Sequence, residues 1–311
     1  MPHKILLTRE LPFPPLEFGG EVVDTVVYKI GGEGYEGAQI LCSTPLDVVD
    51  AQLIDSLPES VGLIANVGIG IDNIDLAAAK ARNIMVSNTP VGNEDTADLA
   101  FTLILAATRQ LYANEQFVRN KVWSVEAPFG VMGQSVHGKT LGILGFGTIG
   151  QAVAKRAAGF DMKIYYYGPN RKEAAEKAMG AIYEPDLAKF LSKLDILSLH
   201  CSLNEKTKHI LNANTLSQLK RGAVVVNTGR GGLIDENALV AALETSHVSA
   251  AGLDVFENEP NVHKGLLARD NVSLTPHMGS ATHEARMQMA QRVIGNMFTF
   301  LQTGKPVDLI E

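Results

Sequence analysis

The sequence has few cysteines and no long apolar run. Of its 311 residues only two are cysteines, Cys42 and Cys201, and neither stands in a C-x-x-C pair or near histidines at metal-ligand spacing. These features disfavour a disulfide-rich secreted protein and a metal site, so we expect a reducing, cytoplasmic compartment and no metal. The longest largely apolar run, residues 99–107, is much shorter than the ~20 residues that span a bilayer. We therefore expect no membrane partner.

Positive charge is also in deficit. The chain has 27 Lys and Arg residues against 34 Asp and Glu residues, which gives a formal net charge of −7. An acidic chain of this kind has no electrostatic reason to bind nucleic acid or an anionic membrane. A small anionic substrate is still compatible with this charge, because a few local basic residues are enough to bind it.

Short apolar runs alternate with helical patterns along the chain, which indicates repeated βα units and parallel sheets. A first series of expected strands covers 5–7, 39–42, 63–65 and 85–87, with helices at 46–56 and 75–82. A second series of expected strands covers 139–144, 163–167, 195–200, 223–227, 249–253 and 271–275. Six such strands fit a doubly wound nucleotide-binding sheet.

Two long helical patterns connect and close these series. One spans 94–120, and the other, 282–303, places Met287, Val293 and Met297 at helical spacing. A return of the last helix onto the first series would make that domain discontinuous. We therefore predict an α/β protein with two doubly wound parallel-sheet domains, a Rossmann cofactor domain inserted into a flavodoxin-like substrate domain. The expected boundaries are 1–94 and 284–311 for the substrate domain and 95–283 for the dinucleotide-binding domain.

Three glycines follow the first expected strand of the second series. The run Gly145-Phe146-Gly147-Thr148-Ile149-Gly150 stands between strand 139–144 and a helical pattern at 151–158. Glycines in this setting permit a tight turn, close approach of a pyrophosphate and close packing of a helix on a strand. We therefore predict a dinucleotide site that includes Gly145, Gly147, Thr148, Ile149 and Gly150.

The next strand lacks the acid that commonly binds an adenosine ribose. It ends at Gly168, and the run Pro-Asn-Arg-Lys follows at 169–172. A guanidinium here suits a ribose 2′-phosphate, so Asn170 and Arg171 favour NADP as the cofactor, with NAD as the alternative. Asn170 also suits the N-cap of the next helix with Glu173 as its capping-box partner, and the two roles are compatible.

Three residues of complementary chemistry follow the last three expected strands. Arg230, Glu259 and His277 come after 223–227, 249–253 and 271–275 in that order. Because ligands bind at the carboxyl ends of parallel strands, we expect these side chains at one edge of the sheet. A permanent cation, a carboxylate and a titratable imidazole suit the binding of a 2-oxo acid and the protonation of its carbonyl. Glu257, two residues before Glu259, keeps the choice of carboxylate open.

In order and spacing these motifs resemble the D-isomer-specific 2-hydroxyacid dehydrogenase family over nearly the whole chain, and most of all its glyoxylate/hydroxypyruvate reductase members. Besides the glycine run, the resemblance rests on GIGIDNID at 68–75, NTP at 88–90, TADLA at 96–100, NTGRG at 227–231, GLDVF at 252–256 and TPH at 275–277. The chain departs from the family at Ser202, where proline is more usual.

The resemblance implies that small 2-oxo acids, such as glyoxylate or hydroxypyruvate, are reduced to D-2-hydroxy acids by hydride from NADPH. It implies that His277 is the general acid, Glu259 its partner and Arg230 the substrate anchor, and that the backbone N–H groups of Ile69 and Gly70 hold the substrate carboxylate. It further implies cofactor contacts by Thr96, Cys201, Thr207, Thr228, Gly229, Asp254, His277 and Gly279.

Other readings of the sequence stay open. A D-3-phosphoglycerate or D-lactate dehydrogenase that uses NAD is one alternative, which the missing ribose acid disfavours. A dinucleotide-sensing interaction protein on the same fold is another, and the intact trio favours the enzyme over it. The resemblance also implies a homodimer, chiefly through the long helix from Glu94. The sequence assigns no role to the loop at 123–132 and does not identify the substrate side chain.

Overall fold

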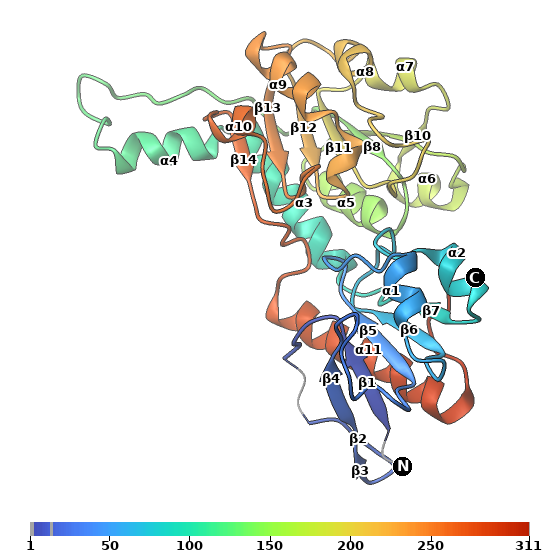
Figure 1. The fold of residues 1–311 in the computed structure, drawn as a ribbon. Coiled ribbons are helices and arrows are strands. Elements are labelled where there is room, and N and C mark those ends of the chain that lie inside the picture. Colours follow the sequence, from blue (N-terminus) through green and yellow to red (C-terminus); the bar gives the residue numbers. More distant parts are fainter. Residues whose placement is uncertain (1–2, 13–14, 311) are drawn as a thin grey trace. The chain divides into compact units, whose positions relative to one another are not determined.

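The structure, a computed structural model, describes residues 3–12 and 15–310, and the chain divides into two compact units. One unit comprises Met1–Gly92 together with Thr282–Glu311, and the other comprises Asn93–Ala281. The sequence places the corresponding boundaries at 94/95 and 283/284. Both units combine helices with parallel sheets, which is the predicted α/β class (Figure 1). Among the residues described, no helix is both long and apolar enough to span a bilayer.

A five-stranded parallel sheet forms the centre of the smaller unit. Its order is β4-β1-β5-β6-β7, which is the 2-1-3-4-5 order of flavodoxin-like sheets. The strands are β1 Lys4–Leu7, β4 Asp24–Val27, β5 Ile40–Ser43, β6 Leu63–Asn66 and β7 Met85–Ser87, and a hairpin adds β2 Glu17–Phe18 and β3 Glu21–Val22. Strand β4 is not predicted from the sequence, because this edge strand exposes Asp24 and Thr25 and so lacks a continuous apolar run.

Helices cover both faces of this sheet. Helices α1 (Ala51–Ser56) and α2 (Leu76–Ala81) share one core, and α11 (His283–Thr303) packs on the opposite face through Val293 and Met297. The prediction that the first helix begins at residue 46 is wrong, since Asp50 caps it by accepting a hydrogen bond from the Leu53 N–H.

The last helix buries a slightly different face from the one expected. Met287 is 64% exposed, whereas Ala285 and Met289 are buried together with Val293 and Met297. These four residues recur at i, i+4, i+8 and i+12, and Met287 lies about half a turn away from them. The helix thus belongs to the smaller unit although it closes the chain.

A seven-stranded parallel sheet forms the centre of the larger unit. Its order is β10-β9-β8-β11-β12-β13-β14, the 3-2-1-4-5-6 order of a Rossmann sheet with one further strand. The strands are β8 Thr140–Leu144, β9 Lys163–Tyr167, β10 Ile182–Tyr183, β11 Ile196–Leu199, β12 Ala223–Asn227, β13 Val248–Leu253 and β14 Val272–Leu274. The prediction of six strands misses β10, because two residues at a sheet edge carry no periodic signal.

Alternate residues of each central strand enter two separate cores. Ile196 and Val224 pack on one face, whereas Leu197 and Val225 pack on the other, as the pleat of a strand requires. The first face carries α3 (Asn93–Thr108) and α5 (Thr148–Ala158), and the second carries α7 (Leu187–Leu191), α8 (Ala213–Ser217) and α9 (Glu236–Glu244). The remaining helices are α4 Leu111–Arg119, α6 Glu173–Met179, α10 Lys264–Leu267 and the 3-10 turn η1 Gly231–Leu233.

The prediction of one helix over 94–120 is wrong, because the chain breaks between α3 and α4. Gln110 adopts the left-handed conformation, with φ at 52°. The carbonyl of Thr108 accepts a hydrogen bond from the backbone N–H of Gln134, a residue far along the chain. In Figure 1, α4 and the loop that follows it extend away from the sheet of this unit.

Candidate active site

The glycine run turns sharply between β8 and α5. Gly145 has φ at +96°, and a Cβ there would lie 2.5 Å from the backbone nitrogen of Cys201. A Cβ at Gly150 would lie 2.2 Å from the Gly145 carbonyl oxygen, so both positions require glycine. Gly147 is different, because in the described part of the chain no atom other than those of its chain neighbours lies within 4 Å of the place its Cβ would take. The N-terminus of α5, where Thr148 and Ile149 stand, is therefore open to a phosphate.

Polar atoms without partners lie at the carboxyl ends of the neighbouring strands. Within the described part of the chain, neither Oγ1 of Thr228 nor Nδ1 of His200 has a hydrogen-bond partner, and both atoms are buried. Nε2 of His200 lies 2.8 Å from the Ser198 hydroxyl, and burial lowers the pKa of His200 to about 4, so its ring is neutral at neutral pH. Together with the open glycine turn, these atoms fit a polar ligand such as a dinucleotide at this edge.

The end of β9 is occupied by an ion pair. Arg171 binds both carboxylate oxygens of Glu176, with Nε to Oε1 and Nη2 to Oε2 each at 2.9 Å. Tyr166 donates to the same carboxylate at 2.6 Å. The bonds from Arg171 and Tyr166 lower the pKa of Glu176 to about 2, and burial with the bond to Glu176 raises that of Tyr166 to about 12. Arg171 keeps its charge and is more than half exposed.

Asn170 does not cap the following helix. Helix α6 begins at Glu173, its N-cap position is Lys172, and the Lys172 side chain makes no capping hydrogen bond with the described residues. The backbone N–H of Lys172 donates instead to the Tyr166 hydroxyl. The capping-box interpretation of Asn170 and Glu173 is therefore wrong. A helix capped by Asn170 would begin at residue 171, whereas α6 begins two residues later, after the Lys172 N–H that binds Tyr166.

His277 and Glu259 form a hydrogen-bonded pair. Nδ1 of His277 lies 2.7 Å from Oε2 of Glu259, and the other carboxylate oxygen of Glu259 accepts the Phe256 N–H at 3.0 Å. Burial alone would raise the pKa of Glu259. The bonds from His277 and Phe256 and the charges of His277 and Arg230 outweigh it and hold the pKa below the usual range. Glu259 is therefore a carboxylate that accepts from His277 and leaves Nε2 of the ring for other chemistry.

The backbone of His277 is itself unusual. Its φ is 50°, a left-handed value that a side-chain-bearing residue rarely adopts, and its N–H donates to the Asp254 carbonyl at 2.8 Å. The Asp254 carboxylate, almost fully buried, accepts from the Thr275 hydroxyl at 2.6 Å and from the Met278 N–H at 2.8 Å. Burial raises the pKa of Asp254. The turn from Thr275 to Met278 is thus tied to the end of β13, which fixes where the imidazole stands.

Arg230 stands at the end of β12, two strands from β14. The buried side chain of Asn227 holds the turn that leads from the end of β12 to Arg230. Its Oδ1 accepts the Gly229 N–H at 3.0 Å, and its Nδ2 donates to the Arg230 carbonyl at 2.9 Å. The charge of Arg230 contributes to the lowered pKa of Glu259, so the two side chains face the same region. No role is predicted for Asn227 from the sequence, although an asparagine that ends an otherwise apolar strand signals such a turn.

Other cofactor residues expected from the sequence lie around the same edge. A Cβ at Gly279 would lie 3.2 Å from the Thr96 side chain and 3.4 Å from Asp254, so these three residues are neighbours. Thr207 closes the loop after β11 by donating its hydroxyl to the Ser202 carbonyl at 2.7 Å. Burial raises the pKa of Cys201 to about 12, so it is an unreactive thiol beside Gly145. In the described parts of the chain, no three His, Cys, Asp or Glu side chains gather to hold a metal ion.

In the smaller unit, Ile69 and Gly70 lie in a loop after β6. Asn66, fully buried, donates its amide to the Gly70 carbonyl at 2.7 Å, and Asn88 donates to the Ile69 carbonyl at 2.9 Å. No acceptor for the N–H groups of Ile69 and Gly70 is found among residues 3–12 and 15–310. The side-chain amides thus hold the two carbonyls, and the two backbone donors are available to a ligand.

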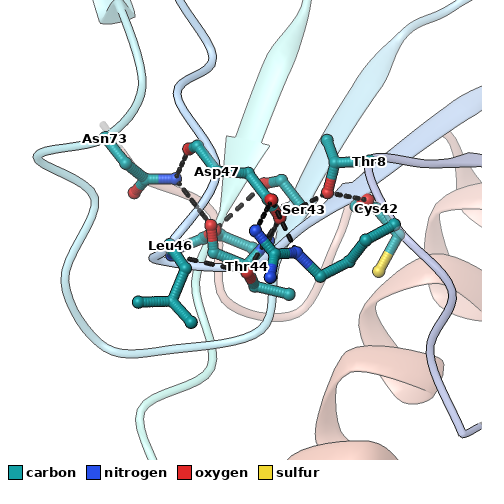
Figure 2. Close-up of polar contacts among 9 residues, drawn as sticks. Thr8, Cys42, Ser43, Thr44, Leu46, Asp47 and Asn73 are labelled. Carbon is teal, nitrogen blue, oxygen red and sulfur yellow. Dashed lines mark hydrogen bonds and ion pairs between the residues drawn. The ribbon is translucent and has the colours of Figure 1, made fainter. Parts of the chain in front are cut away.

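A second polar cluster, formed by residues that follow β1 and β5, is hydrogen-bonded to the segment after this loop (Figure 2). Asp47 accepts hydrogen bonds from the Thr8 hydroxyl and from both the N–H and the hydroxyl of Thr44, and it pairs with Arg9. These bonds outweigh the effect of burial and keep the pKa of Asp47 below its usual value. Asn73 donates at 3.0 Å to the carbonyls of both Thr44 and Asp47, which ties residues 44–47 to the segment that follows Ile69 and Gly70.

Comparison with known proteins places the chain in a family. The family profile of the D-isomer specific 2-hydroxyacid dehydrogenase NAD-binding domain matches residues 101–279. A glyoxylate reductase of Thermococcus litoralis is 39% identical over 100% of this chain and 97% of its own length, and one of Korarchaeum cryptofilum is 39% identical over 100% and 96%.

Solved structures agree with this placement. A glyoxylate reductase from Paecilomyes thermophila has a TM-score of 0.87 and 33% identity, with 99% of this chain and 98% of that chain covered. An NADPH-dependent glyoxylate/hydroxypyruvate reductase from Sinorhizobium meliloti has a TM-score of 0.89 and 33% identity, with 99% and 97% covered. The chain therefore belongs to the D-isomer specific 2-hydroxyacid dehydrogenases, which are NAD(P)-dependent oxidoreductases.

Proposed function

We propose that this enzyme reduces small 2-oxo acids, such as glyoxylate and hydroxypyruvate, to D-2-hydroxy acids, with NADPH as the hydride donor. The observation that carries this proposal is the His277–Glu259 pair at 2.7 Å, at the carboxyl edge of the sheet to which Arg230 belongs. The names of the similar glyoxylate reductases and of the glyoxylate/hydroxypyruvate reductase support the substrate class.

His277 is the proton donor of this reaction. A bound reduced nicotinamide supplies a hydride to the carbonyl carbon of the substrate. Nδ1 of His277 faces Glu259, so Nε2 is the nitrogen that delivers a proton to the carbonyl oxygen, and the product is the 2-hydroxy acid. The Glu259 carboxylate stabilises the imidazolium before the transfer and fixes the ring orientation, as the partner of a catalytic histidine does.

The substrate-binding groups that we infer are Arg230 in the larger unit and the loop of Ile69 and Gly70 in the smaller unit. A guanidinium offers only hydrogen-bond donors, so Arg230 polarises the ketone and binds the carboxylate and does not supply the proton. The N–H groups of Ile69 and Gly70 offer two adjacent donors of the kind that hold carboxylates. The buried amide of Asn66 supports this role, because it keeps the Gly70 carbonyl turned away from the ligand.

The preference for NADPH rests on Arg171 at the end of β9. Its guanidinium is held by Glu176 through Nε and Nη2, and Nη1 lies 4.0 Å from Oε1 of Glu173. The Arg171 side chain is still more than half exposed, so a 2′-phosphate can meet its positive charge from the solvent side. No carboxylate stands among residues 168–172 to bind a ribose hydroxyl instead. The similarity to an NADPH-dependent reductase and to its complex with NADP also supports this preference.

One set of assays tests the proposal. The oxidation of NADPH and of NADH is followed with glyoxylate, hydroxypyruvate, pyruvate and 3-phosphohydroxypyruvate, and kcat/KM is compared. We expect the highest values with glyoxylate or hydroxypyruvate and NADPH. A preference for 3-phosphohydroxypyruvate or pyruvate with NADH would favour the D-3-phosphoglycerate or D-lactate dehydrogenase alternative. Tight cofactor binding without turnover of any oxo acid would favour a dinucleotide sensor.

We also propose that the enzyme is a cytoplasmic homodimer. Apolar side chains on α4 and its loop are strongly exposed, among them Val125, Phe129 and Met132, each at least 80% exposed. Such a projecting apolar segment suits burial against a second copy. Both cysteines are free thiols, which supports a reducing compartment. Sedimentation tests the dimer: replacing Val125 and Phe129 by Ser should give monomers, and a monomeric wild type would reject it.

A further inference from the structure

A buried carboxylate outside the proposed catalytic trio joins the two segments that carry Arg230 and Glu259. Glu236 is the first residue of α9 and is only 5% exposed. Its Oε1 accepts the Glu257 N–H at 3.0 Å, and its own N–H donates to Oε2 of Glu257 at 3.2 Å. The two glutamates thus exchange hydrogen bonds between side chain and backbone in both directions.

The same two segments touch at a position that only glycine can fill. A Cβ at Gly231 would lie 1.9 Å from the carbonyl carbon of Phe256 and 2.4 Å from the nitrogen of Glu257. Gly231 directly follows Arg230, and the Phe256 N–H donates to Glu259, which in turn accepts from His277. The Phe256–Glu257 peptide therefore packs against the residue after Arg230 and directly follows the N–H that holds Glu259, and its own N–H donates to Glu236.

The charges around Glu236 show that this bond is not incidental. Glu257 and Glu259 face it from the opposite segment and His263 from the start of α10, and His209 pairs with the outer oxygen of Glu257. Burial and the neighbouring carboxylates raise the pKa of Glu236, so the site is an unfavourable one for an acid. A buried carboxylate next to two others lowers the stability of the fold, and an apolar residue could fill the same space without that cost. The presence of an acid at this position therefore indicates a role for its hydrogen bonds.

We propose that Glu236 is a positioning residue for catalysis, whose acceptor oxygen sets the register between the Arg230 segment and the Glu259–His277 pair. This inference rests on the proposed function. Loss of the bond frees the Phe256–Glu257 peptide to shift, and the Glu259 carboxylate moves with it away from His277. Displacements of about 1 Å in a catalytic group are enough to lower turnover by about 100-fold.

Three variants test this role. Glu236→Ala removes the acceptor, Glu236→Gln keeps an acceptor oxygen without the charge, and Glu244→Gln at the exposed end of the same helix is the matched control. We expect Glu236→Ala to lower kcat at least tenfold with the dissociation constant for NADPH, read from fluorescence, within twofold of wild type. Glu236→Gln should restore kcat to within about threefold, and Glu244→Gln should have no effect.

The pH profile of kcat separates positioning from a loss of folded enzyme. When Glu259 moves away from His277, the pH at which reduction declines should fall in Glu236→Ala and stay near that of wild type in Glu236→Gln. A loss of folded protein lowers the whole curve without moving it. An equal shift in both variants would mean that the charge of Glu236 acts on His277 directly, which would overturn the proposal.

Other outcomes are equally decisive. Wild-type kcat in Glu236→Ala, or equal losses in the Ala and Gln variants, would overturn the role of the acceptor. If Glu236→Ala does not fold, Glu236→Asp takes its place, because it keeps the charge but draws the acceptor back, and it should then lose kcat. A wild-type enzyme inactive on every oxo acid would remove the proposed function and this inference together, whereas an active enzyme indifferent to Glu236 removes only the inference.

Discussion

His277 donates toward Glu259 across 2.7 Å although 18 residues separate them in the chain. The pair forms because β13 and β14 are parallel neighbours, so the segments after them leave the sheet at the same edge. A second bond, from the Phe256 N–H, prevents the carboxylate from turning away from the imidazole. This arrangement holds one ring nitrogen and leaves the other for a substrate.

Replacement of His277 should abolish most turnover while cofactor binding persists. His277→Gln keeps a polar side chain but has no proton to transfer, so kcat for glyoxylate reduction should fall by about 10² to 10⁴. The dissociation constant for NADPH should change less than twofold. His283→Gln, at the exposed start of α11, is the control. Turnover close to that of wild type in His277→Gln would show that another group donates the proton.

Replacement of Arg171 should change the choice between the two cofactors. Arg171→Ser removes the charge proposed to meet a 2′-phosphate, so the dissociation constant for NADPH should rise at least tenfold, about 1.4 kcal/mol. NADH, which lacks that phosphate, should bind as before. Fluorescence titration with both cofactors gives the ratio, and Lys172→Ser is the neighbouring control. An unchanged NADPH affinity would mean that Arg171 serves only its ion pair with Glu176.

Gly231 and Gly295 should respond in opposite directions to alanine. In Gly231→Ala the added Cβ meets the Phe256 carbonyl at 1.9 Å, which should cost about 1–3 kcal/mol of unfolding free energy and also lower kcat. Gly295 lies within α11, and among the residues described no atom beyond its own helical turn lies within 4 Å of its missing Cβ, so alanine there should stabilise the protein by about 0.5–1 kcal/mol. Denaturant unfolding measures both, and a tolerated alanine at position 231 would contradict the close approach.

Glu176 should make stability depend on acid pH. Its pKa in the folded protein is about 2, below the ordinary value of about 4.3 in unfolded chains. A depressed pKa contributes stability that is complete above the unfolded value and is lost as pH falls toward the folded one. The midpoint of thermal unfolding should therefore fall less steeply in Glu176→Gln than in wild type between pH 4.5 and pH 2. Parallel curves over this window would show that the Arg171 and Tyr166 bonds do not persist in solution.

Much of the fold follows from the sequence by itself. Apolar runs at fixed intervals specify the buried parallel strands, because a strand covered on both faces has no polar alternative. The glycine turn after β8 is equally local, since φ at Gly145 excludes a side chain. The order of Arg230, Glu259 and His277 after three successive strands also predicts their common edge. The short strands β4 and β10 are not predicted in this way. Each lies at the edge of its sheet and pairs with a strand on one side only, so it does not require a continuous apolar run.

Tertiary contacts decided what local pattern left open. The sequence predicts Glu259 but leaves Glu257 open as an alternative, and the fold separates them: Glu259 reaches His277, whereas Glu257 turns to His209 and the N-terminus of α9. The break at Gln110 likewise depends on the distant N–H of Gln134, which takes the Thr108 carbonyl out of the helix. Composition and periodicity therefore determined the strands and the chemical groups available. Hydrogen bonds between residues far apart in the chain determined which of those groups meet, because periodicity carries no information about a partner outside its own segment.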